Sequence, residues 1–182
     1  MDQHVIRPVR AEEWQRVKEL RLAALRDPAA PVAFLETLEQ GEGRSDEFWQ
    51  ERTEGGSRGR GARQFVAEGP DGEWDGSVTL LGEGKGTVDF FGEAVAEEQG
   101  HLVGVFVREG ARGSGLAERL FAAALEWGWG LEEPALERVR LFVHEDNARA
   151  AAFYRRYGFT PSGRVLRLES GALEHEYVYA RP

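Results

Sequence analysis

The apolar positions of the N-terminal third predict one strand followed by two helices. Residues 4–9 (HVIRPV) predict the strand. Residues 11–27 predict a helix, because their apolar side chains recur on one face at spacings of three and four. A second helix is predicted around residues 45–52 (SDEFWQER), with Ser45 or Asp46 as its N-cap.

The middle of the chain alternates between turn residues and apolar runs. Residues 54–63 (EGGSRGRGAR) predict a surface loop. Two strands follow, at residues 64–69 and 76–84, joined by a turn. Residues 85–100 show no apolar periodicity and are acidic, so they predict an irregular segment.

The second half alternates strands and helices. Its predicted elements are a strand at 101–107, a helix at about 115–130, a strand at 138–144, a helix at 147–158 and two strands near 163–169 and 173–180. Because a helix connects the strands 101–107 and 138–144, we expect these strands to be parallel neighbours. Both are nearly continuous apolar runs, which is typical of central parallel strands.

These elements predict one α/β domain over residues 1–182, because no repeat or low-complexity linker divides the chain. We expect a single mixed, mostly antiparallel β-sheet of about seven strands with a central parallel pair. The helices should cover both faces of this sheet. The last two strands are expected to form a hairpin at one end of it.

Composition is that of an ordinary globular protein, with 41% hydrophobic and 30% charged residues in a chain of 182. No apolar run approaches the roughly 18 residues of a membrane span. The first ten residues also lack the apolar stretch of a signal peptide. We therefore expect a cytoplasmic protein that does not bind a membrane.

The absence of cysteine removes several classes of chemistry. Disulfides, thiolate metal sites and a covalent cysteine intermediate are all excluded. The net charge of -9 disfavours a nucleic-acid binder, which needs basic surface. An acidic surface favours a cationic ligand or an amine instead.

The stretch RGSGLAERL (112–120) places glycines at 113 and 115 just before an apolar helical pattern. Free N–H groups gather at a helix N-terminus, where the helix dipole is positive. Glycines there let an anion approach the backbone, which makes a phosphate cradle one interpretation and a tight turn without a ligand the other. The stretch lacks the G-x-G-x-x-G fingerprint and the Gly-Lys-Ser/Thr of a P-loop.

Two stretches resemble the signatures of the GNAT superfamily of N-acetyltransferases. Residues 112–117 (RGSGLA) resemble its Arg/Gln-x-x-Gly-x-Gly/Ala signature. Residues 147–159 (NARAAAFYRRYGF) resemble its second signature, an Asn, an Ala three positions later, an aromatic-Tyr pair and then Gly-Phe. The order of the predicted elements also fits the fold of that family, so the resemblance covers most of the chain.

The resemblance implies acetyl-CoA as the cosubstrate, no metal, and direct attack of an amine on the thioester. The pantetheine arm would pair with the strand edge at Val105, Phe106 and Val107, whose N–H groups can stabilise an oxyanion. The pyrophosphate would bind backbone N–H groups at Arg112, Gly113, Ser114, Gly115, Leu116 and Ala117. The side chain of Arg112 is expected to contact phosphate as well, with a solvated arginine as the alternative.

Two residues of the second signature carry expected roles. Tyr154 matches the general acid of the family, and a tyrosine keeps its proton at neutral pH and can give it to the leaving thiolate. The alternative for Tyr154 is an aromatic residue on the core face of a helix. Asn147 is expected to contact the pantetheine arm, to cap its helix, or both.

The general base stays open at this point. Some members of the family use a Glu in the strand that matches 138–144, and this chain has Phe142 there. Others use a Glu early in the strand before the phosphate loop, where this chain has His101. A partly solvated structural histidine is the alternative for His101. Glu97, Glu98 and water are further candidates for the base.

The acceptor is expected to be the amine of a small molecule or a peptide. Its site should involve residues 28–40, the segment 85–100 and the last hairpin. The stretch 34–37 (FLET) could place an apolar wall and the carboxylate of Glu36 near the amine. A non-catalytic acyl-CoA-binding module is the main alternative function, and a nucleotide binder is a third. A homodimer is one possible state of the chain.

Overall fold

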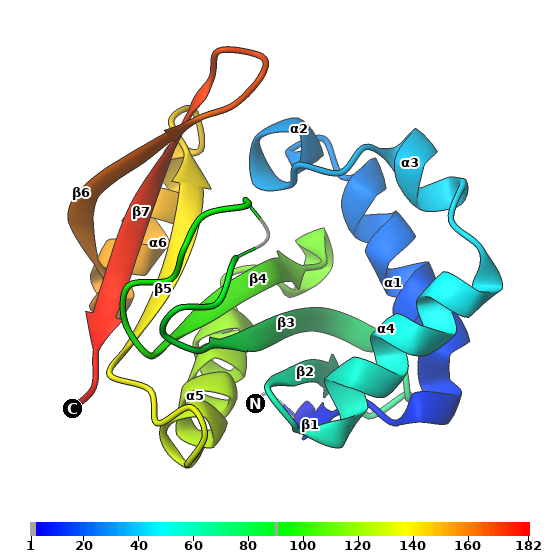
Figure 1. The fold of residues 1–182 in the computed structure, drawn as a ribbon. Helices are drawn as coiled ribbons and strands as arrows, with labels where there is room; N and C mark the ends of the chain where they lie inside the picture. The colour runs from blue at the N-terminus through cyan, green and yellow to red at the C-terminus, as the bar shows by residue number, and fades with distance from the viewer. Residues whose placement is uncertain (1–2, 90) are drawn as a thin grey trace.

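Seven strands form one mixed sheet in the order β1-β2-β3-β4-β5-β7-β6 in the computed structural model, which describes residues 3–89 and 91–182 (Figure 1). The strands are β1 (Val5–Pro8), β2 (Ala62–Glu68), β3 (Trp74–Glu83), β4 (Gln99–Val107), β5 (Arg138–His144), β6 (Thr160–Arg167) and β7 (Leu173–Ala180). Among these seven strands of the described residues, β4 and β5 pair in parallel and the other pairings are antiparallel. The predicted fold class is therefore confirmed.

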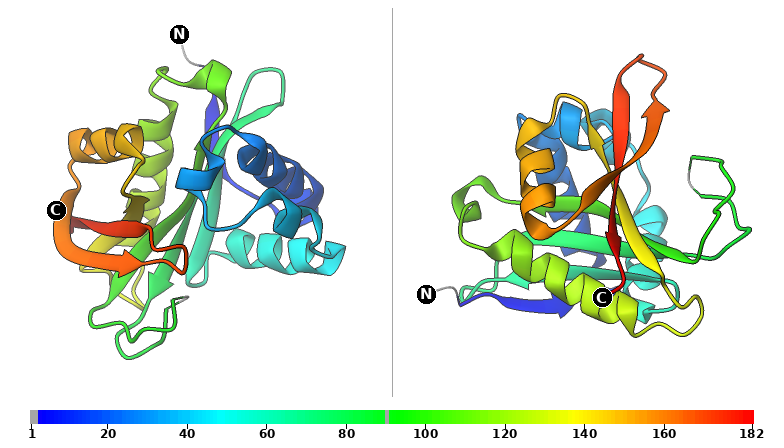
Figure 2. Two further views of the ribbon diagram at one scale, coloured as in Figure 1. Left: turned by 90° about the horizontal axis from the view of Figure 1, so that it is seen from above. Right: turned by 90° about the vertical axis from the view of Figure 1, so that its left-hand side faces the viewer.

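Helices cover both faces of the sheet (Figure 2). On one face lie α1 (Trp14–Arg26) and α4 (Asp46–Arg58), and on the other lie α5 (Leu116–Trp129) and α6 (Ala148–Tyr157). Two short helices, α2 (Ala30–Ala33) and α3 (Leu38–Glu42), connect α1 to α4. One-turn 3₁₀ helices, η1 (Ala11–Glu13) and η2 (Glu109–Ala111), precede α1 and α5.

Each layer of helices buries its own apolar core against the sheet. Under α5 and α6, the ring of Phe121 is fully buried and contacts three aromatic side chains of α6 and the ring of Phe159, which follows that helix. Under α1, the side chains of Val17, Leu20 and Ala24 pack with Phe106 of β4. The helical apolar pattern of residues 11–27 is thus the buried face of α1.

The connection between α1 and β2 differs from the prediction. Residues 54–63 were expected as a surface loop, but α4 continues to Arg58 and β2 begins at Ala62. Glycine at position 59 adopts a φ of 70° and ends α4, as is common at helix C-termini. The helices α2 and α3 were not predicted, because four or five residues are too few to show a periodic pattern. Ser45 caps α4, in line with the prediction.

A bulge and a separation of two strands open the sheet at its centre. β4 and β5 pair only at Gln99–Arg138, Gly100–Val139 and His101–Arg140, and then diverge (Figure 1). Between Val103 and Phe106, the register of β4 against β3 shifts by one residue, with Gly104 at a φ of 64°. Such a bulge bends a strand and increases its twist. Among the described residues, no strand therefore pairs with β4 beyond His101 on the β5 side.

Candidate active site

A cavity of about 1570 Å³ occupies the opening between β4 and β5. Its walls come from the separated parts of both strands, the N-terminal turns of α5 and α6, and the segment from α1 to α4. This cavity brings together the two stretches, near residues 112 and 147, that the sequence singled out. The cavity is large enough for a bulky ligand and a second, smaller one.

The N-terminus of α5 opens into the cavity without a cap. In the described part of the chain, no side chain accepts a hydrogen bond from its first turn. The N–H groups of Leu116, Ala117 and Glu118 therefore have no intrahelical partner. Glycines 113 and 115 have φ values of 78° and 86°, and an added Cβ would meet nothing within 4 Å. Backbone conformation, rather than crowding, is what requires glycine here.

Arg112 differs from the expectation, and the side chain of Ser114 bonds within the loop. The Arg112 N–H donates to the Glu109 carbonyl at 3.2 Å, so it is not free for a phosphate. Its guanidinium donates to the Val107 carbonyl at 3.0 Å and to Asp27 Oδ2 at 2.6 Å. Ser114 Oγ donates to the Ala111 carbonyl, and Ser114 lies outside the cavity lining. Both residues shape the loop that presents the following N–H groups.

The edge of β4 forms one wall of the cavity. Val105, Phe106 and Val107, the residues expected to pair with the pantetheine arm, all line it. The Phe106 side chain is only 8% exposed and packs into the core under α1, which leaves mainly the backbone of this residue for a ligand. Unpaired strand edges offer N–H and C=O groups to an extended molecule.

Tyr154 enters the cavity from α6. Its ring is 8% exposed and stacks on Phe121 with 5.9 Å between the ring centroids. Burial, together with the negative charge of Glu174, raises the pKa of the Tyr154 phenol above its ordinary value. Tyr154 is thus a core aromatic residue of α6, as one of the two interpretations of the sequence has it, and it also lines the cavity.

Asn147 caps α6 and reaches across to α2. Its Oδ1 accepts a hydrogen bond from the Ala150 N–H at 3.3 Å, which confirms the predicted N-cap. Its Nδ2 donates to the Val32 carbonyl at 3.5 Å. Asn147 lines the cavity, and its side chain ties the α1–α4 segment to α6.

His101 lies at the point where β4 and β5 separate. The imidazole is 2% exposed and packs near the rings of Phe91 and Phe142, at centroid distances of 6.2 Å and 5.5 Å. Its Nδ1 lies 3.5 Å from Glu83 Oε2. His101 lines the cavity. Because it is buried, it is not the partly solvated histidine of the alternative interpretation.

Glu97 and Glu98 do not belong to this site. Both lie outside the cavity lining, and Glu97 forms an ion pair with Arg138 at 3.4 Å. They precede the separation of β4 from β5, where the two strands are still paired. The structure therefore does not support either of them as the general base.

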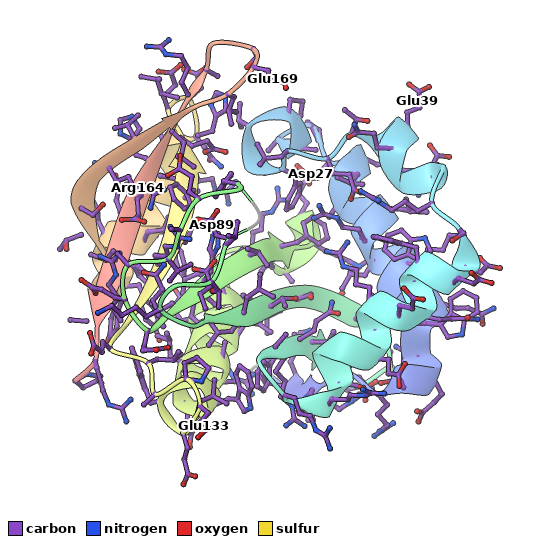
Figure 3. All side chains as sticks on the ribbon, in the orientation of Figure 1. Asp27, Glu39, Asp89, Glu133, Arg164 and Glu169 are labelled. Atoms are coloured by element: carbon purple, nitrogen blue, oxygen red, sulfur yellow. The ribbon has the colours of Figure 1, made fainter. Side chains whose placement is uncertain are left out.

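A buried ion cluster lies behind His101. Arg140 of β5 is fully buried and contacts Glu83, Asp89 and Glu176, at distances of 2.9 Å, 2.9 Å and 3.1 Å. In Figure 3, Asp89 comes from the segment between β3 and β4 that lies over this part of the sheet. Burial alone would raise the pKa values of Glu83 and Asp89. The Glu83 pKa is lowered by His101 first and by the charge of Arg140 after it, and the Asp89 pKa is lowered by hydrogen bonds from Arg140 and from backbone N–H groups. The cluster fixes Glu83 beside His101.

Glu174 is a cavity residue that the sequence analysis missed. It lies on β7 opposite His144, is 9% exposed, and its Oε2 is buried without a hydrogen bond to any described residue. Burial raises the pKa of the Glu174 carboxyl, although His144 acts in the opposite direction. The alternation of Glu174, Glu176 and their neighbours in β7 is also the pattern of a solvent-facing strand, so the sequence did not mark it.

The α1–α4 side of the cavity matches the predicted acceptor region only in part. Residues 29–40 contribute most of it, the segment 85–100 contributes Phe91, and β7 contributes Glu174, while Phe90 lies outside the described residues. The Glu36 carboxylate was expected to face an amine, but it holds two guanidinium groups. Its oxygens lie 3.1 Å from Arg21 Nε and 2.5 Å from Arg44 Nε. This end of the cavity is cationic.

The described helices include none that is long and apolar enough to cross a membrane. Within residues 3–89 and 91–182, no three His, Asp or Glu side chains are grouped so as to hold a metal ion.

Several solved structures share the fold at low sequence identity. A GNAT-family acetyltransferase from Streptococcus pneumoniae superposes with a TM-score of 0.70 at 16% identity, covering 98% of this chain and 100% of that one. The PaiA N-acetyltransferase from Thermoplasma acidophilum, in complex with coenzyme A, gives 0.68 at 17% identity, with 97% and 99% covered. A chimera of the spermidine N-acetyltransferase SpeG from Vibrio cholerae and hSSAT gives 0.68 at 17%, with 98% and 96% covered. No curated protein sequence matches this chain.

The family itself follows from the sequence match and the fold together. The family model described as "Acetyltransferase (GNAT) family" matches residues 14–159, a range that includes the separated strands, the α5 loop and α6. We conclude that this chain belongs to the GNAT family of acetyltransferases.

Proposed function

We propose that this protein transfers the acetyl group of acetyl-CoA directly to an amine. One observation carries the proposal: the uncapped N-terminus of α5, the unpaired edge of β4 and Tyr154 all line the same cavity. These are an anion site, an extended backbone edge and a proton donor.

Acetyl-CoA fits this arrangement as the donor. The N–H groups from Gly113 to Ala117, together with the positive end of the α5 dipole, would hold the pyrophosphate. Arg149 and Arg156 line the same part of the cavity from α6 and would add charge for phosphate groups. The edge at Val105 to Val107 would pair with the pantetheine arm, and Asn147 lies within its reach across the cavity.

Different residues of the chain would then assist different steps of the acetyl transfer. The thioester supplies the acyl group, and the amine nitrogen forms a bond to its carbonyl carbon as the bond from carbon to sulfur breaks. Backbone N–H groups of β4 stabilise the oxygen that gains negative charge. The Tyr154 hydroxyl gives its proton to the departing sulfur, and water restores that proton. A base removes the proton that the amine nitrogen loses.

His101 is our choice for that base, with Glu83 holding its Nδ1 side. We expect His101→Gln to lower kcat about 10- to 100-fold at neutral pH, and less than a full general-base effect because water can also accept the proton. The same substitution should also remove the acidic limb of the pH–rate profile, that is, the fall in kcat at low pH. Glu174→Gln is the comparison, because Glu174 also lines the cavity and burial raises the pKa of its carboxyl. Loss of that limb in Glu174→Gln alone would assign the base to Glu174 instead.

The rival function is an acyl-CoA-binding module without catalysis. It would use the α5 N-terminus and the β4 edge in the same way, but it would have no use for a protonated tyrosine at the wall. Tyr154 at the cavity therefore favours an enzyme. Cytoplasmic location, and a homodimer as one possible state, stay predictions.

Thermal unfolding in the presence of acetyl-CoA tests the donor. A ligand that binds only the folded state adds RT ln(1 + [L]/Kd), or about 2.7 kcal/mol at a hundredfold excess over Kd. We expect acetyl-CoA to raise the unfolding temperature, and ATP and NAD at equal concentration to leave it nearly unchanged. An equal shift with ATP would favour a nucleotide binder, and no shift with saturating acetyl-CoA would reject the proposal.

A further inference from the structure

Three arginines converge on the acceptor end of the cavity. Arg21 comes from α1, Arg44 from the segment before α4, and Arg52 from α4, and all three line the cavity. The carboxylate of Glu36 bridges Arg21 and Arg44. The net charge of the whole chain is -9, so a group of three arginines is unusual for this protein.

Arg52 is the cation of this group that no carboxylate neutralises. Within the described residues it has no hydrogen bond or ion pair, and its guanidinium lies 5.9 Å and 5.8 Å from the ring centroids of Phe48 and Trp49. Arg52 is exposed to solvent and lines the cavity, so a ligand can reach its guanidinium. An arginine in this state is stabilised by an anion from outside the chain.

Few carboxylates compete for Arg52 from this side of the cavity. Glu36 is an acidic group whose charge acts on Arg52, and its carboxylate is already shared by Arg21 and Arg44. Glu39 also borders the cavity, but its side chain points outward from α3 in Figure 3. Asp27 is engaged by Arg112 at 2.6 Å.

The arginines also lie close to the reacting edge of β4. A second, small hollow of about 30 Å³ is bordered by Arg21 and Arg52 on one side and by Gly104 and Phe106 of the β4 bulge on another. An anion held by Arg52 would therefore lie near the strand edge along which the acyl group is expected.

We propose that the acceptor is a small amine that also carries an oxyanion group, such as an amino acid, and that Arg52 with Arg21 and Arg44 binds this group. The inference rests on the proposed function, because it assigns the acceptor of that reaction. Arginine suits the role because its planar fork matches carboxylate and phosphonate oxygens. Polyamines, which are cationic throughout, would be repelled at this end of the cavity.

Matched pairs of amines test the inference. We would measure kcat/KM with acetyl-CoA for common α-amino acids, their amides, aminoalkylphosphonates and a polyamine. We expect an amino acid to exceed its own amide at least tenfold, because the amide keeps the amine and loses only the charge. The phosphonates decide whether the site prefers a planar or a tetrahedral anion. Equal or higher activity with the amide or the polyamine would overturn the inference.

Variants of Arg52 locate the effect. Arg52→Gln should lower kcat/KM for the acidic amine about 10- to 100-fold, the effect of losing a charge-assisted hydrogen bond, and should change the value for its amide less than about threefold. Arg52→Lys should give a kcat/KM for the acidic amine between those of the wild type and Arg52→Gln, because lysine keeps the positive charge but lacks the planar guanidinium. Arg58→Gln is the control, since Arg58 lies on the same helix, pairs with Glu54 and is outside the cavity lining. Equal losses for both amines would contradict the assignment.

A binding measurement separates this inference from the function it rests on. Thermal unfolding with the amino acid alone should show stabilisation of the wild type, weaker stabilisation of Arg52→Gln, and none by the amide. If acetyl-CoA binds and amines are acetylated without regard to their acidic group, only this inference fails. If acetyl-CoA does not bind, the proposed function fails, while the amino-acid measurement still decides whether Arg52 holds an anion.

Discussion

Replacing Tyr154 with phenylalanine will lower kcat about 10²- to 10⁴-fold and leave the Kd for acetyl-CoA close to that of the wild type. The change removes one hydroxyl from the cavity wall and keeps the ring that stacks on Phe121. Without that hydroxyl, the thiolate must leave without a positioned proton donor. The pKa of the phenol is raised, so its proton is in place at every pH from neutral to mildly alkaline.

The measurement is steady-state kinetics of CoA release, with acetyl-CoA affinity determined separately by equilibrium binding. Tyr157→Phe is the matched control, because Tyr157 lies one turn along the same helix, packs on the same Phe121 ring and is outside the cavity lining. We expect this control to keep most of the activity. A Tyr154→Phe enzyme with the kcat of the wild type would remove Tyr154 from the mechanism.

Replacing Arg140 with methionine will destabilise the fold by about 3–5 kcal/mol, because it leaves buried carboxylates without their common partner. Arg140 is fully buried, and the side chains of Asp89 and Glu176 are 1% and 2% exposed. Chemical denaturation at neutral pH measures the loss. Arg164→Met is the control, since Arg164 pairs with Glu93 at the surface and is worth about 1 kcal/mol at most.

The pH dependence of stability will have opposite signs in the two proteins. In the wild type, the folded-state pKa values of Glu83 and Asp89 lie below the ordinary ones. Their contribution is therefore complete above about pH 4–5 and is lost as the pH falls below about 4. In Arg140→Met, the unpaired carboxylates favour the protonated form, so lowering the pH from 7 toward 5 should raise stability. An Arg140→Met protein that responds to pH like the wild type would show that the cluster is not coupled as described.

The fold was predictable where elements are long and connections follow strong topological rules. Strand 138–144 has the bounds that its apolar run predicted, and the crossover through α5 determined the parallel pairing of β4 and β5. The helices α2 and α3 were not predictable, because so few residues carry no period. Their positions depend on tertiary contacts, among them the bond from Asn147 to the Val32 carbonyl.

The site was predictable where function depends on the backbone. Gly113 and Gly115 have positive φ values, a backbone conformation that favours glycine, so the sequence itself indicates this turn. The sequence does not indicate which side chains pair with one another. That Glu36 would be held by Arg21 and Arg44, and Arg112 by Asp27, depends on residues up to 85 positions apart in the chain. Arg52 and Glu174 became visible as site residues only through the cavity that they line.

The wild-type reaction is the most direct test of the central claim, that this chain transfers an acetyl group from acetyl-CoA to an amine. Free CoA and acetylated amine would be quantified together, by a thiol assay and by mass spectrometry, for the acidic, neutral and polyamine acceptors. The account predicts that the two products form in equal amounts, only when an amine is present, and fastest with an acidic one. Stable binding of acetyl-CoA with no amine-dependent release of CoA from any acceptor would contradict it and assign the chain as an acyl-CoA-binding module.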